Sequence, residues 1–582
     1  MQRAYYSKSL TKFILESESS ILGELSSKHA NRQLDELQIN AWKSQIKILR
    51  EKVNGQKGKI YFEFAIPRMG KRVDNIIIIH DTIFIVEFKV NDRIYSKNAI
   101  EQAIDYTIDL KNFHEGSHKA KLIPVVVSTK AKNWPENTDA VKHFHTAAKA
   151  NQSNLKQVLD QYIEVSNEPI NIENWENSLY KPTPTIVQAA QALYKGHNVE
   201  EITRSDSGAI NLSKTADCIN DIIHNSKNNK LKSICFVTGV PGAGKTLAGL
   251  NVAVDRMNTD KDEHAVFLSG NGPLVEVLRE ALTRDEVATE KLRGNKLTKK
   301  KAAIKANSFI QNIHHFRDDN LLSNKAPVER VVVFDEAQRA WTKHQTSSFM
   351  RRKKGKDDFD MSEPEFLISV MDRHTDWCTI VCLIGGGQEI NTGEAGLEEW
   401  IKSLARSFPD WQIHFSTPIL TQSNYLKSEA SKSFLVKNGH QTRDLHLSVS
   451  IRSFRSEKLS RFIHEMLELN LSHAQNLFKE IKNDYPIVIT RDLEKAKKWM
   501  KSKALGTERI GLVASSGARR LRPKGIDVKN EISASNWFLN DSTDIRSSYF
   551  LEDVATEFDI QGLEIDWCCV AWGANFYLKD SE

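Results

Sequence analysis

Four nearly continuous apolar runs in the middle of the chain predict a buried parallel sheet. They occupy residues 233–237, 265–268, 331–334 and 379–384. A strand that helices cover on both faces loses the alternation of apolar and polar positions and becomes apolar throughout. The segments between these runs are expected to be helical, so that strands and helices alternate. The pattern predicts an α/β domain over residues 231–415.

The N-terminal residues 1–165 follow a different order of elements. Apolar residues at helical spacing predict a helix over 34–53. Three apolar strands come next, and a second helix and a further strand follow them. This order predicts a small mixed sheet in a separate α/β domain. These later elements are expected at 60–64, 75–79, 83–90, 98–113 and 122–127.

The rest of the chain is predicted to form a connector and a C-terminal domain. The connector covers 166–230, where Pro182 and Pro184 favour an extended backbone. Residues 416–582 contain further short apolar runs, which predict strands of a second α/β domain. Those strands are expected at 446–449, 487–490, 510–513 and 568–572.

The segment 239–246 reads Gly-Val-Pro-Gly-Ala-Gly-Lys-Thr and lies between a predicted strand and a predicted helix. This is the spacing and context of a phosphate-binding loop, in which backbone N–H groups surround a polyphosphate at a helix N-terminus. The lysine can reach the β- and γ-phosphates of ATP, and the threonine hydroxyl can ligate Mg²⁺. The predicted nucleotide-binding residues of this loop are Gly239, Gly242, Gly244, Lys245 and Thr246.

Two acids follow the apolar strand at 331–334. The carboxyl end of a parallel strand beside a phosphate loop is where Mg²⁺ and the attacking water are expected. Asp335 is therefore predicted to hold Mg²⁺ through the water shell of the ion, and Glu336 to polarise the hydrolytic water.

The sequence Asp-Glu-Ala-Gln at 335–338 resembles the second motif of superfamily 1 helicases, and further segments resemble other motifs in the same order. Ser-Gly-Asn-Gly-Pro-Leu at 269–274 matches a motif that contacts single-stranded nucleic acid in those helicases. The resemblance implies that Gln388 senses the γ-phosphate and that Arg452 is an arginine finger. It also places Glu564, in a segment like the fifth motif, at the nucleotide site.

Taken together, these motifs resemble those of the Schlafen group 3-like helicases, also called the DUF2075 family, over about residues 180–582. The resemblance implies two RecA-like P-loop domains that use ATP and Mg²⁺. Members of the family continue to a sixth motif that carries an arginine, whereas this sequence ends at Glu582 without it. A longer natural protein, an arginine donated by a neighbouring protomer and a slow nucleotide switch are the three explanations.

The N-terminal domain carries a separate set of polar residues. Asp74 precedes one predicted strand, and Glu87 and Lys89 end the next. Side chains two residues apart in a strand share a face, so Glu87 and Lys89 point together. A short turn joins the two strands, which brings Asp74 toward Glu87. Two such carboxylates can hold Mg²⁺ or Mn²⁺ with positions open for water and phosphate.

A helical segment that follows carries Gln102 and Tyr106 on one face, because they are four residues apart. With the upstream acids and lysine, this set resembles the PD-(D/E)xK nucleases of the RecB-like branch. The resemblance implies a restriction-endonuclease-like fold and a metal-dependent nuclease. That branch usually adds an acid from its first helix, and Glu36 or Glu63 is the candidate for this role.

Charge and hydropathy narrow the choice of partners. The chain of 582 residues has a formal net charge of +6, with basic clusters at 291–305 and 351–356. Each cluster is expected either to be a solvated surface or to contact a phosphate backbone. The sequence contains no run of roughly 18 apolar residues and no apolar signal segment, so a cytoplasmic protein without a membrane partner is expected.

The combined expectation is an ATP-dependent nuclease–helicase that acts on nucleic acid, with DNA favoured over RNA. It resembles single-protein nuclease–helicase systems directed at phage, which implies a role in antiphage defence. Two alternatives are a nuclease–helicase of DNA repair and a nucleotide-dependent sensor that controls a nuclease without moving along a strand. The oligomeric state is left open.

Overall fold

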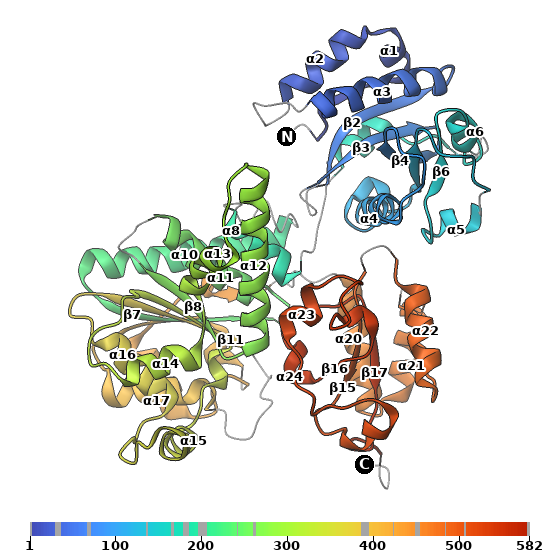
Figure 1. The fold of residues 1–582 in the computed structure, drawn as a ribbon. Coiled ribbons are helices and arrows are strands. Elements are labelled where there is room, and N and C mark those ends of the chain that lie inside the picture. The colour runs from blue at the N-terminus through green and yellow to red at the C-terminus, as the bar shows by residue number, and fades with distance from the viewer. Residues whose placement is uncertain are drawn as a thin grey trace. The chain divides into compact units, whose positions relative to one another are not determined.

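The computed structural model describes most of the chain, in two compact units. One unit comprises residues 1–182 with 496–510, and the other comprises 183–495 with 511–582. Each unit is described by itself below (Figure 1). The described residues are 3–28, 36–66, 71–135, 138–163, 168–178, 185–195, 206–240, 242–259, 264–385, 395–422, 424–448, 454–482, 485–505 and 508–578.

The first unit is built on a six-stranded mixed sheet in the order β1-β2-β3-β4-β5-β6. The first four strands pair antiparallel, and β4, β5 and β6 pair parallel. The parallel strands place Lys89 beside Ser128 at their carboxyl ends. The strands are β1 (Tyr6–Ser9), β2 (Gly58–Ile66), β3 (Lys71–Ile79), β4 (Thr82–Lys89), β5 (Lys121–Ser128) and β6 (Ala148–Ala150).

Helices cover both faces of this sheet (Figure 1). Trp42 and Ile46 of α3 pack with Phe62 and Ile77 on one face, whereas Tyr106 of α4 packs with Ile85 on the other. Helix, three strands, helix and strand follow one another as the sequence predicts. The helices are α1 (Leu10–Leu15), α2 (Glu18–Lys28), α3 (Glu36–Lys52), α4 (Lys97–Phe113), α5 (Thr138–Lys142), α6 (Leu155–Asp160) and α7 (Ile172–Asn177), with a 3-10 turn η1 (Glu115–Ser117).

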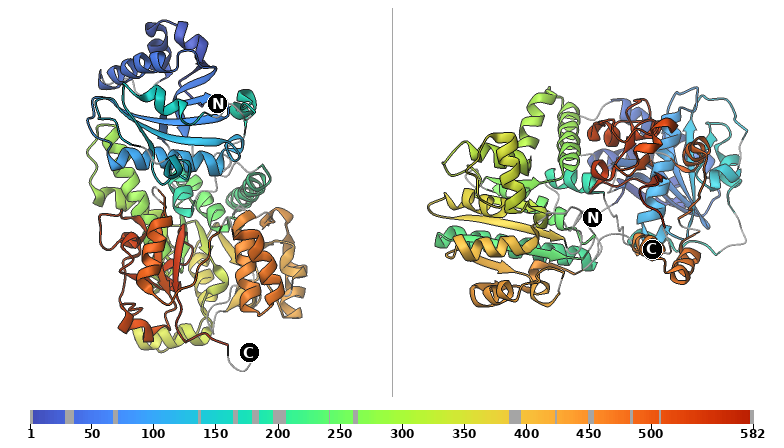
Figure 2. Two further views of the ribbon diagram at one scale, coloured as in Figure 1. Left: turned by 90° about the vertical axis from the view of Figure 1, so that its right-hand side faces the viewer. Right: turned by 90° about the horizontal axis from the view of Figure 1, so that it is seen from below.

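The second unit contains an eight-stranded parallel sheet in the order β13-β12-β7-β11-β10-β8-β9, with β14 paired to β7. The four apolar runs of the sequence are strands β7, β8, β10 and β11 of this sheet, so the parallel sheet is confirmed. Two separate apolar cores lie on its faces, which helices cover (Figure 2). The strands are β7 (Lys232–Gly239), β8 (Ala265–Ser269), β9 (Ile310–Asn312), β10 (Val331–Asp335), β11 (Cys378–Gly385), β12 (Gln412–Phe415), β13 (Gly439–Gln441) and β14 (His446–Leu447).

Of the strand predicted at 446–449, residues 446 and 447 form β14, which belongs to this large sheet and not to the C-terminal strands with which the sequence grouped it. Leu447 pairs with Gly239 at the end of β7. This pairing buries the Leu447 side chain in the apolar core beside the phosphate loop, which favours the position of β14. The helices around the sheet are α8 (Ile186–Tyr194), α10 (Asp206–Asn229), α11 (Lys245–Thr259), α12 (Gly272–Leu292), α13 (Lys299–Phe309), α14 (Ile313–Leu321), α15 (Lys343–Phe349), α16 (Glu363–Asp372), α17 (Gly396–Ser407), α18 (Pro418–Thr421) and α19 (Glu429–Asn438), with η2 (Ala337–Arg339), a π-helical turn η3 (Met350–Lys354) and η4 (Arg443–Leu445).

A smaller three-stranded sheet follows, in the order β16-β15-β17. The predicted strands at 510–513 and 568–572 correspond to two of its members. The segment 487–490 forms no strand and is exposed, so that expectation was wrong. The elements are α20 (Phe454–Leu467), α21 (Leu471–Ile481), α22 (Leu493–Lys503), β15 (Ile510–Ala514), η5 (Arg519–Lys524), α23 (Ala534–Leu539), η6 (Ser548–Phe550), β16 (Val554–Ala555), α24 (Glu557–Ile560) and β17 (Trp567–Ala571).

Candidate active sites

The predicted phosphate loop starts at the end of β7, at Gly239, and finishes at the start of α11, at Lys245. Gly242 and Gly244 have φ angles of 74° and 85°, a region that glycine adopts without the cost a side chain would add. Helix α11 begins at Lys245, whose Nζ donates a hydrogen bond to the carbonyl oxygen of Gly239 at 3.1 Å. The loop therefore joins a strand end to a helix N-terminus, where a phosphate group is stabilised.

Asp335 lies at the carboxyl end of β10, directly beside this loop. The hydroxyl Oγ1 of Thr246 donates a hydrogen bond to Asp335 Oδ1 at 3.2 Å. Burial, and then the neighbouring charge of Glu336, raise the pKa of Asp335 to about 7. A buried carboxylate with a raised pKa needs a cation to stay ionised, which suits a magnesium site.

Gln338, for which the sequence predicts no role, holds the side chain of Glu336 in place. Glu336 itself has a left-handed backbone with φ of 52°. Gln338 Nε2 donates a hydrogen bond to Glu336 Oε2. Gln338 Oε1 accepts a hydrogen bond from the backbone N–H of Gly385 at 2.9 Å, at the end of β11. Gln338 thus connects the acid pair to the neighbouring strand, and its place in the Asp-Glu-Ala-Gln sequence was the available signal.

The motif after β8 contacts the segment that resembles a fifth helicase motif. Asn271 Oδ1 caps α12 by accepting from the N–H of Leu274 at 3.2 Å, and Asn271 Nδ2 donates to the carbonyl oxygen of Gln561 at 2.6 Å. Glu564 lies three residues further along that segment and is exposed. Gln388 and Arg452 lie outside the described residues.

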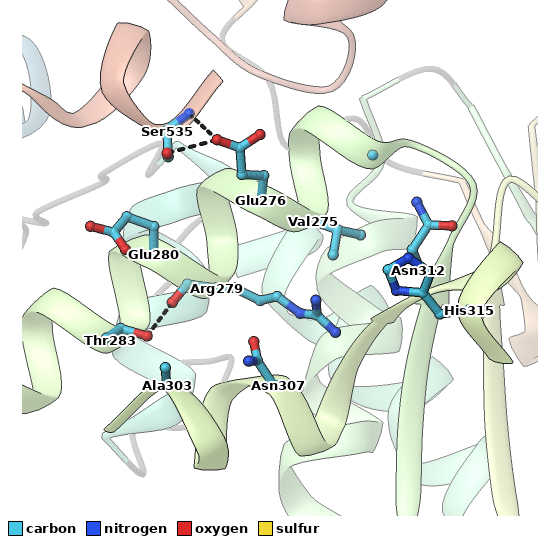
Figure 3. Close-up of a pocket in the computed structure, with 11 residues that line it drawn as sticks. Val275, Glu276, Arg279, Glu280, Thr283, Ala303, Asn307, Asn312, His315 and Ser535 are labelled. Atoms are coloured by element: carbon cyan, nitrogen blue, oxygen red, sulfur yellow. Dashed lines mark hydrogen bonds between the residues drawn. The ribbon is translucent and has the colours of Figure 1, made fainter. Parts of the chain in front are cut away.

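A cavity of about 390 Å³ opens beside this contact, lined by α12, α13 and α14 (Figure 3). The guanidinium group of Arg279 points into the cavity, and its Nε donates to the carbonyl oxygen of Ile310 at 2.7 Å. On its rim, Glu276 Oε1 accepts hydrogen bonds from Ser533 and Ser535. These bonds tie α12 to the start of α23.

Asp74, Glu87 and Lys89 of the first unit form a second cluster, in which Glu87 is buried and the other two are half-buried. Asp74 is on β3, and its Oδ2 accepts a hydrogen bond from the backbone N–H of Phe88 on β4 at 2.8 Å. Burial, and then the charge of Glu87, raise the pKa of Asp74 well above its usual value. Lys89 Nζ donates to Glu87 Oε1 at 2.9 Å. The hairpin therefore brings the three residues together, as the sequence predicts.

Helix α4 places two further predicted residues against this cluster. Gln102 Nε2 donates a hydrogen bond to the hydroxyl of Tyr106 at 2.8 Å. Burial raises the pKa of Tyr106, and the nearby charges of Glu87, Asp74 and Glu63 raise it further. The phenol therefore stays protonated at neutral pH, and the carboxylates are near enough for their charge to act on it.

Of the two acids considered for an additional ligand, Glu63 is the one beside the cluster. Its charge contributes to the raised pKa of Asp74. Its Oε1 accepts hydrogen bonds from Trp42 Nε1 at 2.9 Å and from Gln38 Nε2 at 3.0 Å, both on α3. Glu36 is exposed at the first residue of α3. Helix α3 thus orients Glu63, an acid on β2, and does not itself supply an acid to the cluster.

The described residues contain no group of three or more His, Cys, Asp or Glu side chains already arranged around a metal position. Asp74 and Glu87 are instead a carboxylate pair with Glu63 nearby. Mg²⁺ usually keeps several waters and needs only one or two carboxylates from the protein, which this set supplies.

Among all the residues that the structure describes, no helix is long and apolar enough to cross a membrane.

A glycine-rich loop after a buried parallel strand, with an acid at a nearby strand end, defines a P-loop nucleotide-binding fold. The chain belongs to the family described as Schlafen group 3, DNA/RNA helicase domain, whose model matches residues 232–582. This membership indicates an NTP-hydrolysing helicase domain that acts on nucleic acid. The match begins at β7 and does not include the six-stranded sheet.

Among solved structures, the chain is similar to the crystal structure of the Pyrococcus furiosus Hef helicase domain. The two share 15% sequence identity over 60% of this chain and 88% of that chain, with a TM-score of 0.23. No curated protein sequence matches the chain.

Proposed function

We propose that this protein is an ATP-dependent nuclease–helicase with two separate active sites. The observation that carries the nuclease half is the meeting of Asp74, Glu87 and Lys89, near Tyr106, in a part of the chain that precedes the helicase family match. The unit would be a restriction-endonuclease-like domain, with its helix, three strands, helix and strand around this cluster. Two RecA-like domains would follow, the first over residues 231–448, because β13 and β14 belong to its large sheet, and the second over the remainder to 582.

The ATPase site would use the residues of the phosphate loop and the acid pair. Lys245 would bind the β- and γ-phosphates, and Thr246 with Asp335 would hold Mg²⁺. Glu336, oriented by Gln338, would polarise the attacking water. Gln388 and Arg452 would complete the site around the γ-phosphate, and Glu564 would contribute from the fifth motif.

The nuclease site would hold Mg²⁺ or Mn²⁺ between Asp74 and Glu87, where the metal would supply an activated water and neutralise phosphate charge. Lys89 would orient that water or stabilise the charge that develops on the phosphate. The protonated hydroxyl of Tyr106, fixed by Gln102, can donate a hydrogen bond to a phosphate oxygen. The negative charge of Glu63 would strengthen the attraction of the site for the metal ion.

The biological role proposed is antiphage defence, by similarity to single-protein nuclease–helicase systems. Plaque counts on cells with and without the protein test this role, and a repair enzyme would instead change survival after DNA damage. A strand-displacement assay separates a motor from a nucleotide-dependent sensor, because only the motor separates a duplex when ATP is present.

The raised pKa of Asp335 predicts that nucleotide binding in the presence of Mg²⁺ depends on pH. When the pH lies below the Asp335 pKa of about 7, a proton competes with Mg²⁺ for the carboxylate. The apparent Mg²⁺ affinity should then fall by about tenfold for each unit by which the pH is lowered. Binding of a fluorescent ATP analogue at fixed, limiting Mg²⁺ measures this. Glu336→Gln should move the midpoint to lower pH, because Glu336 raises the pKa of Asp335. A flat profile would contradict the magnesium role.

The basic cluster at 351–356 predicts a salt-dependent interaction with nucleic acid. Arg352 and Lys353 are exposed on the π-helical turn η3. Changing both to glutamine should reduce the slope of log binding constant against log salt by about 1.4–1.8, since each phosphate contact contributes about 0.7–0.9. Fluorescence anisotropy of a labelled single strand measures the slope. Lys43→Gln with Lys47→Gln, exposed on α3, changes the charge equally and should leave it unaltered.

If the η3 variant and the wild-type protein show the same slope of log binding constant against log salt, the cluster at 351–356 is a solvated surface that does not contact nucleic acid. The cluster at 291–305 is a weaker candidate because acids on α12 already neutralise part of it. Lys299 pairs with Glu280 at 2.7 Å, and Arg293 pairs with Glu290 at 2.9 Å.

A further inference from the structure

An exposed tryptophan stands on the same face of the first sheet as the proposed nuclease site. Trp134 follows β5 and is 54% exposed, which is unusual for so large an apolar ring. Lys149 Nζ lies over this ring at 4.3 Å from its centre. Lys130 and Lys132, in the same loop, are exposed as well. An exposed aromatic ring among lysines is the combination that binds the bases and phosphates of single strands.

Strand register places this pair close to the carboxylates. Glu87 on β4 is paired with Val126 on β5, and Val126 is paired with Lys149 on β6. Directly paired residues of parallel strands point to the same face, and Val126 packs against α4 there. Lys149 is therefore two strands from Glu87, or about 10 Å. That spacing is on the order of one or two nucleotides of an extended strand.

The loop that carries Trp134 is held firmly and is not a free surface segment. Buried Asn151 donates from Nδ2 to the carbonyl oxygen of Ala131 at 2.9 Å and to Oδ1 of Asn133 at 2.7 Å. The hydroxyl of Tyr95 donates to the carbonyl oxygen of Lys132 at 3.1 Å. At its start, the loop is joined to Lys89, whose carbonyl oxygen accepts from the N–H of Thr129 at 3.2 Å. These hydrogen bonds fix residues 129–133, and the ring of Trp134 that follows is exposed to solvent.

We propose that Trp134, with Lys149 over one face of its ring, is a stacking platform for an unpaired base of the strand that enters the site at Asp74 and Glu87. The inference rests on the proposed nuclease function and names its substrate class, a single-stranded nucleic acid. The ring would bind the base regardless of sequence, because every base has an aromatic face. Lys149 would neutralise the adjoining phosphate.

Photocrosslinking tests the platform independently of cleavage. The probe is a single-stranded DNA that carries iododeoxyuridine, irradiated with the full-length Asp74→Ala protein so that the strand stays intact. Mass spectrometry of the digest should find an adduct on the peptide that contains Trp134. Trp134→Ala should lower its yield at least about fivefold, since stacking on an aromatic ring contributes about that factor or more per base. Trp134→Phe should restore it.

The matched control is Trp572→Ala, because Trp572 is 57% exposed and belongs to the other unit. This change should leave the adduct on Trp134 unaltered. An unlabelled single strand should compete for the platform, whereas a strand of abasic sites should compete poorly. In a protein with intact Asp74, Trp134→Ala should raise KM for cleavage of single strands by a similar factor and leave kcat nearly unchanged.

The two proposals fail in different ways. If the protein cuts single strands and Trp134→Ala changes neither the crosslink nor KM, the platform is wrong and the nuclease stands. If no strand is cut but the adduct forms at Trp134, the platform binds nucleic acid and the nuclease assignment is wrong. Adducts confined to residues 232–582 would also overturn the platform and would leave Trp134 as a contact for another protein.

Discussion

Lys245→Ala should lower the rate of ATP hydrolysis by at least about 100-fold, the loss typical when one group that stabilises transition-state charge is removed. The structure places Lys245 at the first residue of α11, with its amine at the mouth of the loop on the carbonyl of Gly239. Glu336→Gln should cause a comparable loss for a different reason, since it removes the acid that polarises water and keeps the loop intact. Steady-state phosphate release measures both.

The two ATPase variants should differ in binding. Lys245→Ala should weaken ATP binding because it removes a charge from the phosphates, whereas Glu336→Gln should bind ATP normally and retain it. Gln338→Leu should resemble a weaker form of Glu336→Gln, because it removes the hydrogen bonds to Glu336 and to Gly385. Hydrolysis at the wild-type rate in either Lys245→Ala or Glu336→Gln would refute the site.

Asp74→Ala should abolish cleavage, with a loss of at least about 100-fold, because even residues outside the first ligand sphere cost 10–100-fold at metal sites. The variant loses the carboxylate that faces Glu87 and the bond to the N–H of Phe88. It should hydrolyse ATP at the normal rate, because Asp74 and the phosphate loop belong to different units. Digestion of a labelled strand, with and without EDTA, measures the effect.

Glu63 and Glu36 provide a matched pair for the same assay. Glu63→Gln should weaken cleavage and shift its metal requirement to higher concentration, because the Glu63 charge acts on Asp74 and is held by Trp42. Glu36→Gln should have no effect, because Glu36 is exposed. Cleavage that survives EDTA, or that survives Asp74→Ala, would place the nuclease elsewhere.

Much of the fold follows from local pattern, because buried parallel strands and phosphate loops have strong sequence signals. The runs that form β7, β8, β10 and β11 are apolar on both faces, and the loop before Lys245 has its glycines where left-handed angles are needed. The pairing of Asp74 with Glu87 also follows from sequence, since a short turn joins their strands.

The parts that could not be predicted depend on contacts between distant segments. His446 belongs to β14, which lies beside β7 although β7 is more than 200 residues earlier in the chain. Its Nδ1 forms a hydrogen bond with Thr238 Oγ1 at 2.8 Å. The role of Glu63 depends on its own left-handed backbone, with φ of 53° inside β2, and its carboxylate bonds to Trp42 on α3. No spacing rule predicts a non-glycine residue in that conformation.

Cleavage of a tailed duplex, followed with and without ATP, tests the account most directly. With ATP and Mg²⁺ the wild-type protein should separate the strands and cut inside the region that began as duplex. Lys245→Ala should cut only the single-stranded tail, and Asp74→Ala should separate the strands without cutting them. Identical fragments with and without ATP, or cutting by Asp74→Ala, would contradict an ATP-dependent nuclease–helicase.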